Sequence, residues 1–150
     1  MSWFMKLRAQ RQPWPRHADY VPAEGVSSGD TSSTVVTEDD FVRDKFDALR
    51  FALGLRVPEC LCAVADKRHG ARPMWLYGLS DRSWACVLFR DGHPTSTVYQ
   101  GGPRRLWDET EAAHTWWTER GEPGFERFGL TVGKGGERAW LDDPAASWPV

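Results

Sequence analysis

The sequence predicts an α+β fold: an antiparallel sheet of about six strands with two helices packed on one face, in the order α-β-β-β-β-α-β-β. Three observations lead to this prediction. Apolar residues recur at helical spacing over residues 37–53 and again over 103–119. Four short apolar runs separated by polar turns lie between these segments, and a glycine-rich hairpin follows them. A length of 150 residues favours one domain, which we place at residues 37–150, behind a flexible arm and linker at residues 1–36.

The first helix is predicted at residues 37–53. Thr37 offers an N-cap hydroxyl, and residues 38–40 are all acidic, which suits the positive end of the helix dipole. Gly54 is the expected stop just past the last helical residue. The apolar residues that follow the cap at helical spacing are Phe41, Val42, Phe46, Ala48, Leu49, Ala52 and Leu53.

Between residues 55 and 100 the apolar period shifts toward two, which is typical of strands. Short turns rich in glycine, proline and aspartate separate the apolar runs, so we predict an antiparallel meander. Its four strands are expected at residues 60–65, 74–79, 83–89 and 95–100.

A second helix is predicted at residues 103–119, because Gly101 and Gly102 break the sheet and Pro103 suits a first helical turn. One stripe of this helix should be buried against the sheet, and Trp116, about 100° round from it, should be partly exposed. The stripe consists of Leu106, Thr110, Ala113 and Trp117.

The last predicted elements are two strands, at residues 128–132 and 138–141, that form a hairpin and complete the sheet. The Gly-Lys-Gly-Gly segment at residues 133–136 looks suited to binding phosphate. No helix follows it, so we interpret it as the hairpin turn.

The N-terminal arm differs in charge from the rest of the chain. Residues 1–16 contain four basic and no acidic residues, whereas the remainder is net negative. Residues 22–36 are rich in Ser, Thr and Gly, so we expect a flexible linker with order beginning at Thr37. The arm is either mobile or docked on its own domain, on a neighbouring subunit or on a partner protein. The aromatic residues that favour docking are Trp3, Phe4, Trp14 and Tyr20.

Composition disfavours membrane and secreted classes. No apolar run approaches the roughly 20 residues of a transmembrane helix, and the N-terminus lacks the apolar core of a secretory signal. Three cysteines cannot form a disulfide framework and fit a reducing compartment. We therefore expect a cytoplasmic protein without a membrane partner.

The cysteines and tryptophans each allow two interpretations. Cys60 and Cys62 share one face of a predicted strand and could meet Cys86 or a metal, but a structural zinc site needs four ligands and usually a longer spacing. We expect buried thiols that behave as small apolar groups, and neither a metal nor a cofactor. The nine tryptophans either fill the core or line a surface that recognises a peptide or protein.

Motifs for catalysis are weak. The sequence has no P-loop, no dinucleotide-binding glycine motif, no nucleophile elbow and no zinc-protease motif. Glu111 and His114 are neighbours on the second helix and could form an acid/base pair or half of a di-metal site, although a solvated helix face is the simpler interpretation. Nucleic acid is not an expected partner, because the ordered region is net negative.

Several segments in the second half of the chain carry a family resemblance. They are residues 102–109 (Gly-Pro-Arg-Arg-Leu-Trp-Asp-Glu), 111–113 and 116–117; residues 124–132 (Gly-Phe-Glu-Arg-Phe-Gly-Leu-Thr-Val); and residues 140–144 and 147–149. Together with residues 51–58, they resemble the C-terminal accessory domain of actinobacterial protein-L-isoaspartate O-methyltransferase-like proteins of the lanthipeptide-associated type. In that family the domain follows a Rossmann-like catalytic domain that binds S-adenosylmethionine. Nothing upstream of Thr37 resembles the catalytic domain, so no catalytic or cofactor-binding residue is carried over.

The resemblance implies a non-catalytic accessory module that recognises a peptide substrate or docks a methyltransferase in a peptide-modification pathway. Arginine would pair with carboxylates of an Asp-rich peptide. Alternatively, the same residues form a helix-to-sheet packing motif with internal ion pairs. The expected binding surface comprises Arg104, Arg105, Trp107, Asp108 and Trp116 of the second helix, with Trp75 and Trp84 of the sheet.

The rival function is a small stand-alone cyclase or hydrolase that uses Glu111 and His114 as acid and base. A deep pocket holding a carboxylate with a raised pKa would favour this enzyme, whereas a shallow groove lined by Trp and Arg would favour the binding module. A homodimer is compatible with either function.

Overall fold

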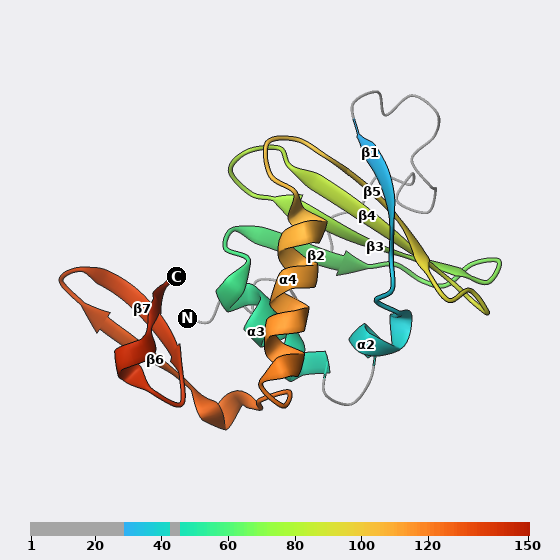
Figure 1. Cartoon of the computed structure of the whole chain (residues 1–150). Helices are drawn as coiled ribbons and strands as arrows, with labels where there is room; N and C mark the ends of the chain where they lie inside the picture. Colours follow the sequence, from blue (N-terminus) through green and yellow to red (C-terminus); the bar gives the residue numbers. More distant parts are fainter. Residues whose placement is uncertain (1–28, 43–45) are drawn as a thin grey trace.

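The main sheet of the computed structural model, which describes residues 29–42 and 46–150, has five antiparallel strands in the order β1-β5-β4-β3-β2 (Figure 1). Strands β2 to β5 form the predicted meander, in which each strand pairs with the next along the chain. The strands are β1 (Asp30–Thr34), β2 (Cys60–Val64), β3 (Ala71–Gly78), β4 (Trp84–Arg90) and β5 (Ser96–Gly101).

Strand β1 occupies part of the segment predicted as a linker, so the expectation that order begins at Thr37 is wrong for Asp30–Thr34. This strand pairs with β5 over its whole length. Four of its five side chains are exposed, so it has no alternating apolar face that would mark it as a strand in the sequence. Backbone pairing with β5, which does not depend on side-chain type, and polar contacts of Asp30 and Thr34 hold this strand in place. The arm at residues 1–28 lies outside the described residues.

Two helices occupy the region of the first predicted helix: α2 (Glu38–Val42) and α3 (Phe46–Arg56), with residues 43–45 outside the described part of the chain. The hydroxyl of Thr37 donates to the carboxylate of Asp40 at 3.0 Å, and the Thr37 N–H donates to the same oxygen at 2.7 Å. Gly54 does not end the helix as predicted, because α3 continues to Arg56.

Helix α4 (Leu106–Glu119) begins three residues later than predicted. Arg105, directly before the helix, has a φ of −94° and a ψ of 73°, outside the right-handed helical region, so the predicted first turn is not helical. The predicted buried stripe is confirmed, and Trp107 is buried beside it. Trp116 is half-buried, as expected. The members of the stripe are Leu106, Thr110, Ala113 and Trp117.

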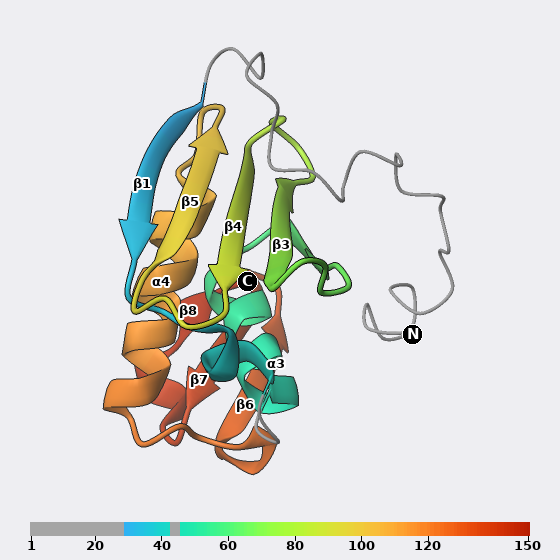
Figure 2. The same cartoon turned by 90° about the vertical axis from the view of Figure 1, so that its right-hand side faces the viewer.

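The C-terminal hairpin forms as predicted, but it does not join the main sheet. Strand β8 pairs with β7, so the hairpin belongs to a separate three-stranded sheet in the order β6-β7-β8 (Figure 2). The expected single sheet of about six strands is therefore corrected to sheets of five and three. The sheet is attached through Phe128, whose ring lies 5.4 Å from that of Phe51 and 6.4 Å from that of Trp116. Its elements are η1 (Phe125–Arg127), β6 (Phe128–Gly133), β7 (Gly136–Leu141), η2 (Pro144–Ala146) and β8 (Trp148–Pro149).

The helices pack on one face of the main sheet, as predicted (Figure 2). Alternate strand residues point toward them and form the core with the buried side of α4, because successive side chains of a strand point to opposite faces. The core residues of the strands are Met74, Leu76, Ala85, Val87, Phe89 and Val98. Among the described residues no helix is long and apolar enough to cross a membrane.

Candidate functional site

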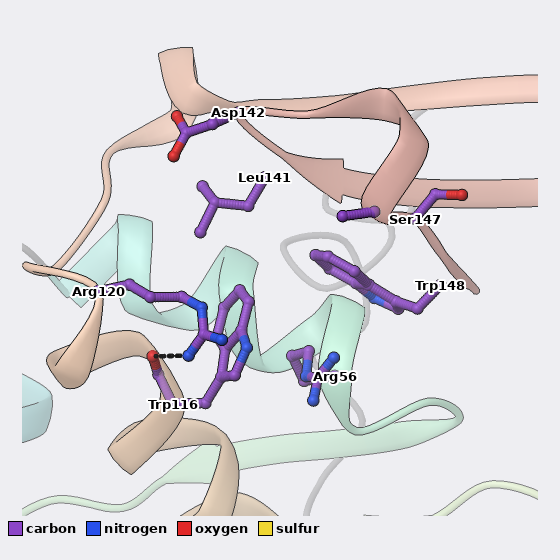
Figure 3. A pocket seen from close by; sticks show the side chains of 8 residues that line it. Arg56, Trp116, Arg120, Leu141, Asp142, Ser147 and Trp148 are labelled. Carbon is purple, nitrogen blue, oxygen red and sulfur yellow. Dashed lines mark hydrogen bonds between the residues drawn. The ribbon is translucent and has the colours of Figure 1, made fainter.

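An open hollow lies between the C-terminal ends of α3 and α4 and the three-stranded sheet (Figure 3). Its volume is about 370 Å³. The hollow is accessible to a ligand from solvent, because three of its lining residues are exposed: Arg56, Arg120 and Asp142. The lining residues are Arg56, Trp116, Arg120, Leu141, Asp142, Ala146, Ser147 and Trp148.

Each wall of the hollow has its own structural support. Arg56 is the last residue of α3, and Trp116 and Arg120 are four residues apart at the end of α4, so both lie on the same helix face. Trp148 is fixed by its indole N–H, which donates to the carbonyl of Leu55 at 3.1 Å. This bond connects the C-terminal strand to α3 and brings the fourth side chain to the site.

The two arginines stack on the two indoles. The guanidinium of Arg56 lies 4.8 Å from the ring centre of Trp116 and 5.1 Å from that of Trp148. Arg120 lies 4.6 Å from the ring centre of Trp116. The indoles of Trp116 and Trp148 meet edge to face, with centroids 5.5 Å apart. These cation–π contacts hold both guanidinium groups at the hollow.

The hollow carries two positive charges, of Arg56 and Arg120, that no carboxylate of the described residues pairs with. Partial burial, with a smaller contribution from the cation of Arg120, lowers the pKa of Arg56. A guanidinium group keeps its proton near neutral pH in proteins. Within the described residues neither forms an ion pair with a carboxylate; Arg120 donates instead to the carbonyl of Trp116 at 3.2 Å. An anion in the hollow would therefore relieve the repulsion between two cations.

Asp142 is the acidic residue that lines the hollow, but its charge is already paired. Arg127 donates to both of its carboxylate oxygens, at 2.9 and 2.6 Å. These hydrogen bonds lower the pKa of Asp142, which therefore stays ionised at neutral pH. A carboxylate with a lowered pKa is a poor general acid.

Among the residues expected to bind, the two arginines before α4 are engaged in internal contacts. Arg104 forms a two-point ion pair with Glu109 and donates to the carbonyl of Pro58 at 2.9 Å. Arg105 pairs with Asp108 at 3.2 Å and also with Asp30 of β1. These pairs match the alternative interpretation of the segment as a packing motif.

The other expected residues do not gather on one surface. Trp107 is only 1% exposed and lies in the core, 6.1 Å from the ring of Phe41. Trp75 and Trp84 lie on the face of the sheet that points away from α4, because they alternate with residues of the core. Of the seven expected residues, Trp116 is the one that lines the hollow.

Glu111 and His114 connect α4 to neighbouring elements. Glu111 accepts a hydrogen bond of 2.5 Å from the hydroxyl of Thr34. The His114 ring lies 5.9 Å from that of Phe41, and its Nε2 is 4.0 Å from a carboxylate oxygen of Asp40. Neither residue lines the hollow, and these contacts support the packing of β1 and α2 on α4.

The cysteines divide between the two faces of the sheet. Cys60 and Cys62 point toward the helices, whereas Cys86 pairs with Trp75 in register and points the other way. Burial raises the pKa of Cys60 and Cys62 to about 11 and that of Cys86 to about 12. The thiols are therefore neutral at physiological pH, and the sheet separates Cys86 from the other two.

Sequence reasoning missed Arg56, Arg120 and Trp148. The spacing of four residues between Trp116 and Arg120 on one helix was a usable signal. The other two residues come from segments distant in sequence, and only the folded chain brings them together.

Comparisons with protein-family models, with curated proteins and with solved structures gave no match for this chain.

Proposed function

We propose that this protein is a non-catalytic binding module that recognises a carboxylate-bearing peptide segment in the hollow between α3, α4 and the three-stranded sheet. The observation that carries the proposal is the pair of guanidinium groups, of Arg56 and Arg120, stacked on Trp116 without a carboxylate partner among the described residues. Guanidinium forks bind carboxylates through two parallel hydrogen bonds, which gives both strength and orientation.

A peptide suits the site better than a small free anion. The indoles of Trp116 and Trp148 offer apolar and aromatic surface beside the charges, and aromatic and Arg side chains dominate the energetics of protein recognition surfaces. The volume of about 370 Å³ accommodates one or two side chains of an extended segment. The family resemblance supports a role beside a methyltransferase in a peptide-modification pathway, in which an Asp-rich peptide would be the recognised segment.

Fluorescence anisotropy with short labelled peptides tests the proposal. Asp-containing peptides with a neighbouring aromatic residue should bind, and the same peptides with Asn in place of Asp should bind at least about tenfold more weakly, equivalent to about 1.4 kcal/mol. Arg56→Gln and Arg120→Gln should each weaken binding of the Asp peptides by a similar factor.

Arg105→Gln is the matched control, because Arg105 is already paired and lies outside the hollow. Binding should also weaken as salt is raised, because the pairing is electrostatic. Equal binding of Asp and Asn peptides would contradict the proposal. Loss of binding in Arg105→Gln but not in Arg56→Gln would instead place recognition on the surface expected from the sequence.

A further inference from the structure

The face of the main sheet that points away from the helices carries an aromatic platform. The rings of Trp75 and Tyr77 stack with centroids 5.8 Å apart and planes 7° apart, and Trp84 lies 6.4 Å from Trp75. Tyr99 lies on the same face, since it pairs in register with Cys86, which pairs with Trp75. We call these four aromatic residues, Trp75, Tyr77, Trp84 and Tyr99, the outer platform.

Two apolar residues of β4 on this face are buried, as in a sheet face that another segment covers. Cys86, which lies between Trp75 and Tyr99 in the register, is only 1% exposed, and Leu88, the next residue of β4 on this face, is 4% exposed. Antiparallel sheets with one solvated face usually place polar residues there. Helices α3 and α4 lie behind the sheet in Figure 2, and no described helix covers the outer platform. This composition indicates a surface built for contact with another apolar segment.

The chain enters the sheet beside the outer platform. A Cβ atom on Gly29, which precedes β1, would lie 2.8 Å from a ring carbon of Trp84 and 3.0 Å from the carbonyl oxygen of Gln100. The backbone thus passes directly against the indole of Trp84. Gly29, where the described residues begin, therefore lies at the rim of this face.

The N-terminal segment, which precedes Gly29, has the length and composition to cover the platform. An extended chain spans about 3.3 Å per residue, whereas adjacent strands are about 4.8 Å apart, so a few residues suffice to cross from β1 to β3. Because the segment is tethered at the rim, its effective concentration at the platform reaches about the millimolar range. Its aromatic residues, which are unusual for an inert tail, are Trp3, Phe4, Trp14 and Tyr20.

We infer that the aromatic N-terminal segment, residues 3–20, docks on the outer platform of its own chain. The platform lies on a different face from the hollow, so this inference does not depend on the proposed function. Aromatic rings of the segment would pack on Trp75, Tyr77 and Tyr99 in the edge or offset arrangements that aromatic pairs favour. A second copy or a partner protein would have to displace this tethered segment in order to reach the face.

Photo-crosslinking of the full chain tests the inference. The photoreactive residue p-benzoylphenylalanine replaces Phe4 or Trp14, so that an aromatic side chain is kept at each position. Mass spectrometry then identifies the residues to which each probe crosslinks. Crosslinks within one chain to residues 71–101 are expected from at least one position. The same probe at Phe125, an exposed position in η1, is the control and should not reach these residues. Crosslinks only to the helices, only between two chains, or to no part of residues 71–101 would overturn the inference.

Limited trypsin digestion of the full chain gives a second measurement. Cleavage after Arg11 and Arg16 should be slow in the natural protein and at least about fivefold faster in Tyr99→Ser, because a docked segment must open before it is cut. Phe125→Ser is the matched control and should leave these rates unchanged. Cleavage of the natural protein at these two sites as fast as that of a free peptide would also overturn the inference.

Discussion

The side chain of Gln100, at the end of β5, caps the first turn of α4: its Oε1 accepts a hydrogen bond from the backbone N–H of Trp107 at 3.1 Å. Its Nε2 donates to the carboxylate of Asp108 at 2.7 Å. Arg105, the residue before the helix, provides no side-chain cap. The free N–H groups of the first helical turn are thus partly satisfied from the sheet. One glutamine therefore connects the two layers of the fold.

Gln100→Ala should lower the free energy of unfolding by about 2 kcal/mol, because it removes a cap and leaves a buried N–H without its partner. Gln100 is only 1% exposed, so water cannot readily replace the amide. Denaturant melts of the variant measure the effect. A loss below about 0.5 kcal/mol would mean that the cap contributes little to stability.

Arg104→Ala should destabilise the protein more than Arg105→Ala. The side chain of Arg104 is 23% exposed and joins Glu109 to the carbonyl of Pro58, so we expect a loss of about 1–2 kcal/mol. Arg105 is 44% exposed and its partners are more exposed still, so solvent screens its ion pairs and its removal should cost clearly less. The same melts compare the two variants, and equal losses would contradict this distinction.

Trp117→Ala should cost about 3–5 kcal/mol, the usual range for emptying a buried aromatic site. The indole of Trp117 is 3% exposed, and its N–H donates to the carbonyl of Pro123 at 3.0 Å. Trp116→Ala should cost clearly less, because Trp116 is half-buried at the hollow. Urea unfolding of both variants measures the two losses in the free energy of unfolding. A larger loss in Trp116→Ala than in Trp117→Ala would refute the prediction.

Two glycines should respond to alanine in opposite directions. Gly54 lies in α3 with open space around its Cβ position, so Gly54→Ala should stabilise the protein by about 0.5–1 kcal/mol. Gly102 has a φ of 94°, and a Cβ there would lie 2.6 Å from the Cα of Ser83, so Gly102→Ala should destabilise it by at least about 1 kcal/mol. Thermal melts measure both variants, and a change in stability of the same sign in Gly54→Ala and Gly102→Ala would contradict the observed backbone.

The buried thiols should make the protein sensitive to alkaline pH. The pKa of Cys60 and Cys62 is raised to about 11, above the roughly 8.5 of an unfolded thiol, so folding favours the protonated form. Their contribution to stability is complete below the unfolded pKa and is lost as the pH rises toward 11. The free energy of unfolding should therefore fall over this range, and less steeply in Cys62→Ala. A thiol reagent at pH 8 should react slowly until denaturant is added.

The sequence by itself determined the type of most elements. The strands from β2 to β5, the buried stripe of α4 and the C-terminal hairpin follow from apolar periodicity, because the side that a helix or strand buries recurs at a fixed local spacing. The same spacing separated Trp117 from Trp116 as buried and half-buried residues. These features depend on neighbours within one element, so the linear order of residues is enough to predict them.

The tertiary structure decided the edge strand β1 and which residues line the hollow. Strand β1 is held by backbone pairing with β5, and its exposed polar side chains carry no periodic signal. The charges of Arg104 and Arg105 are satisfied internally, so these residues do not form the surface that their sequence suggested. Arg56 and Trp148 meet because the indole of Trp148 bonds to the carbonyl of Leu55, across 93 positions of the chain. Contacts of this kind depend on where whole elements pack, which local spacing does not encode.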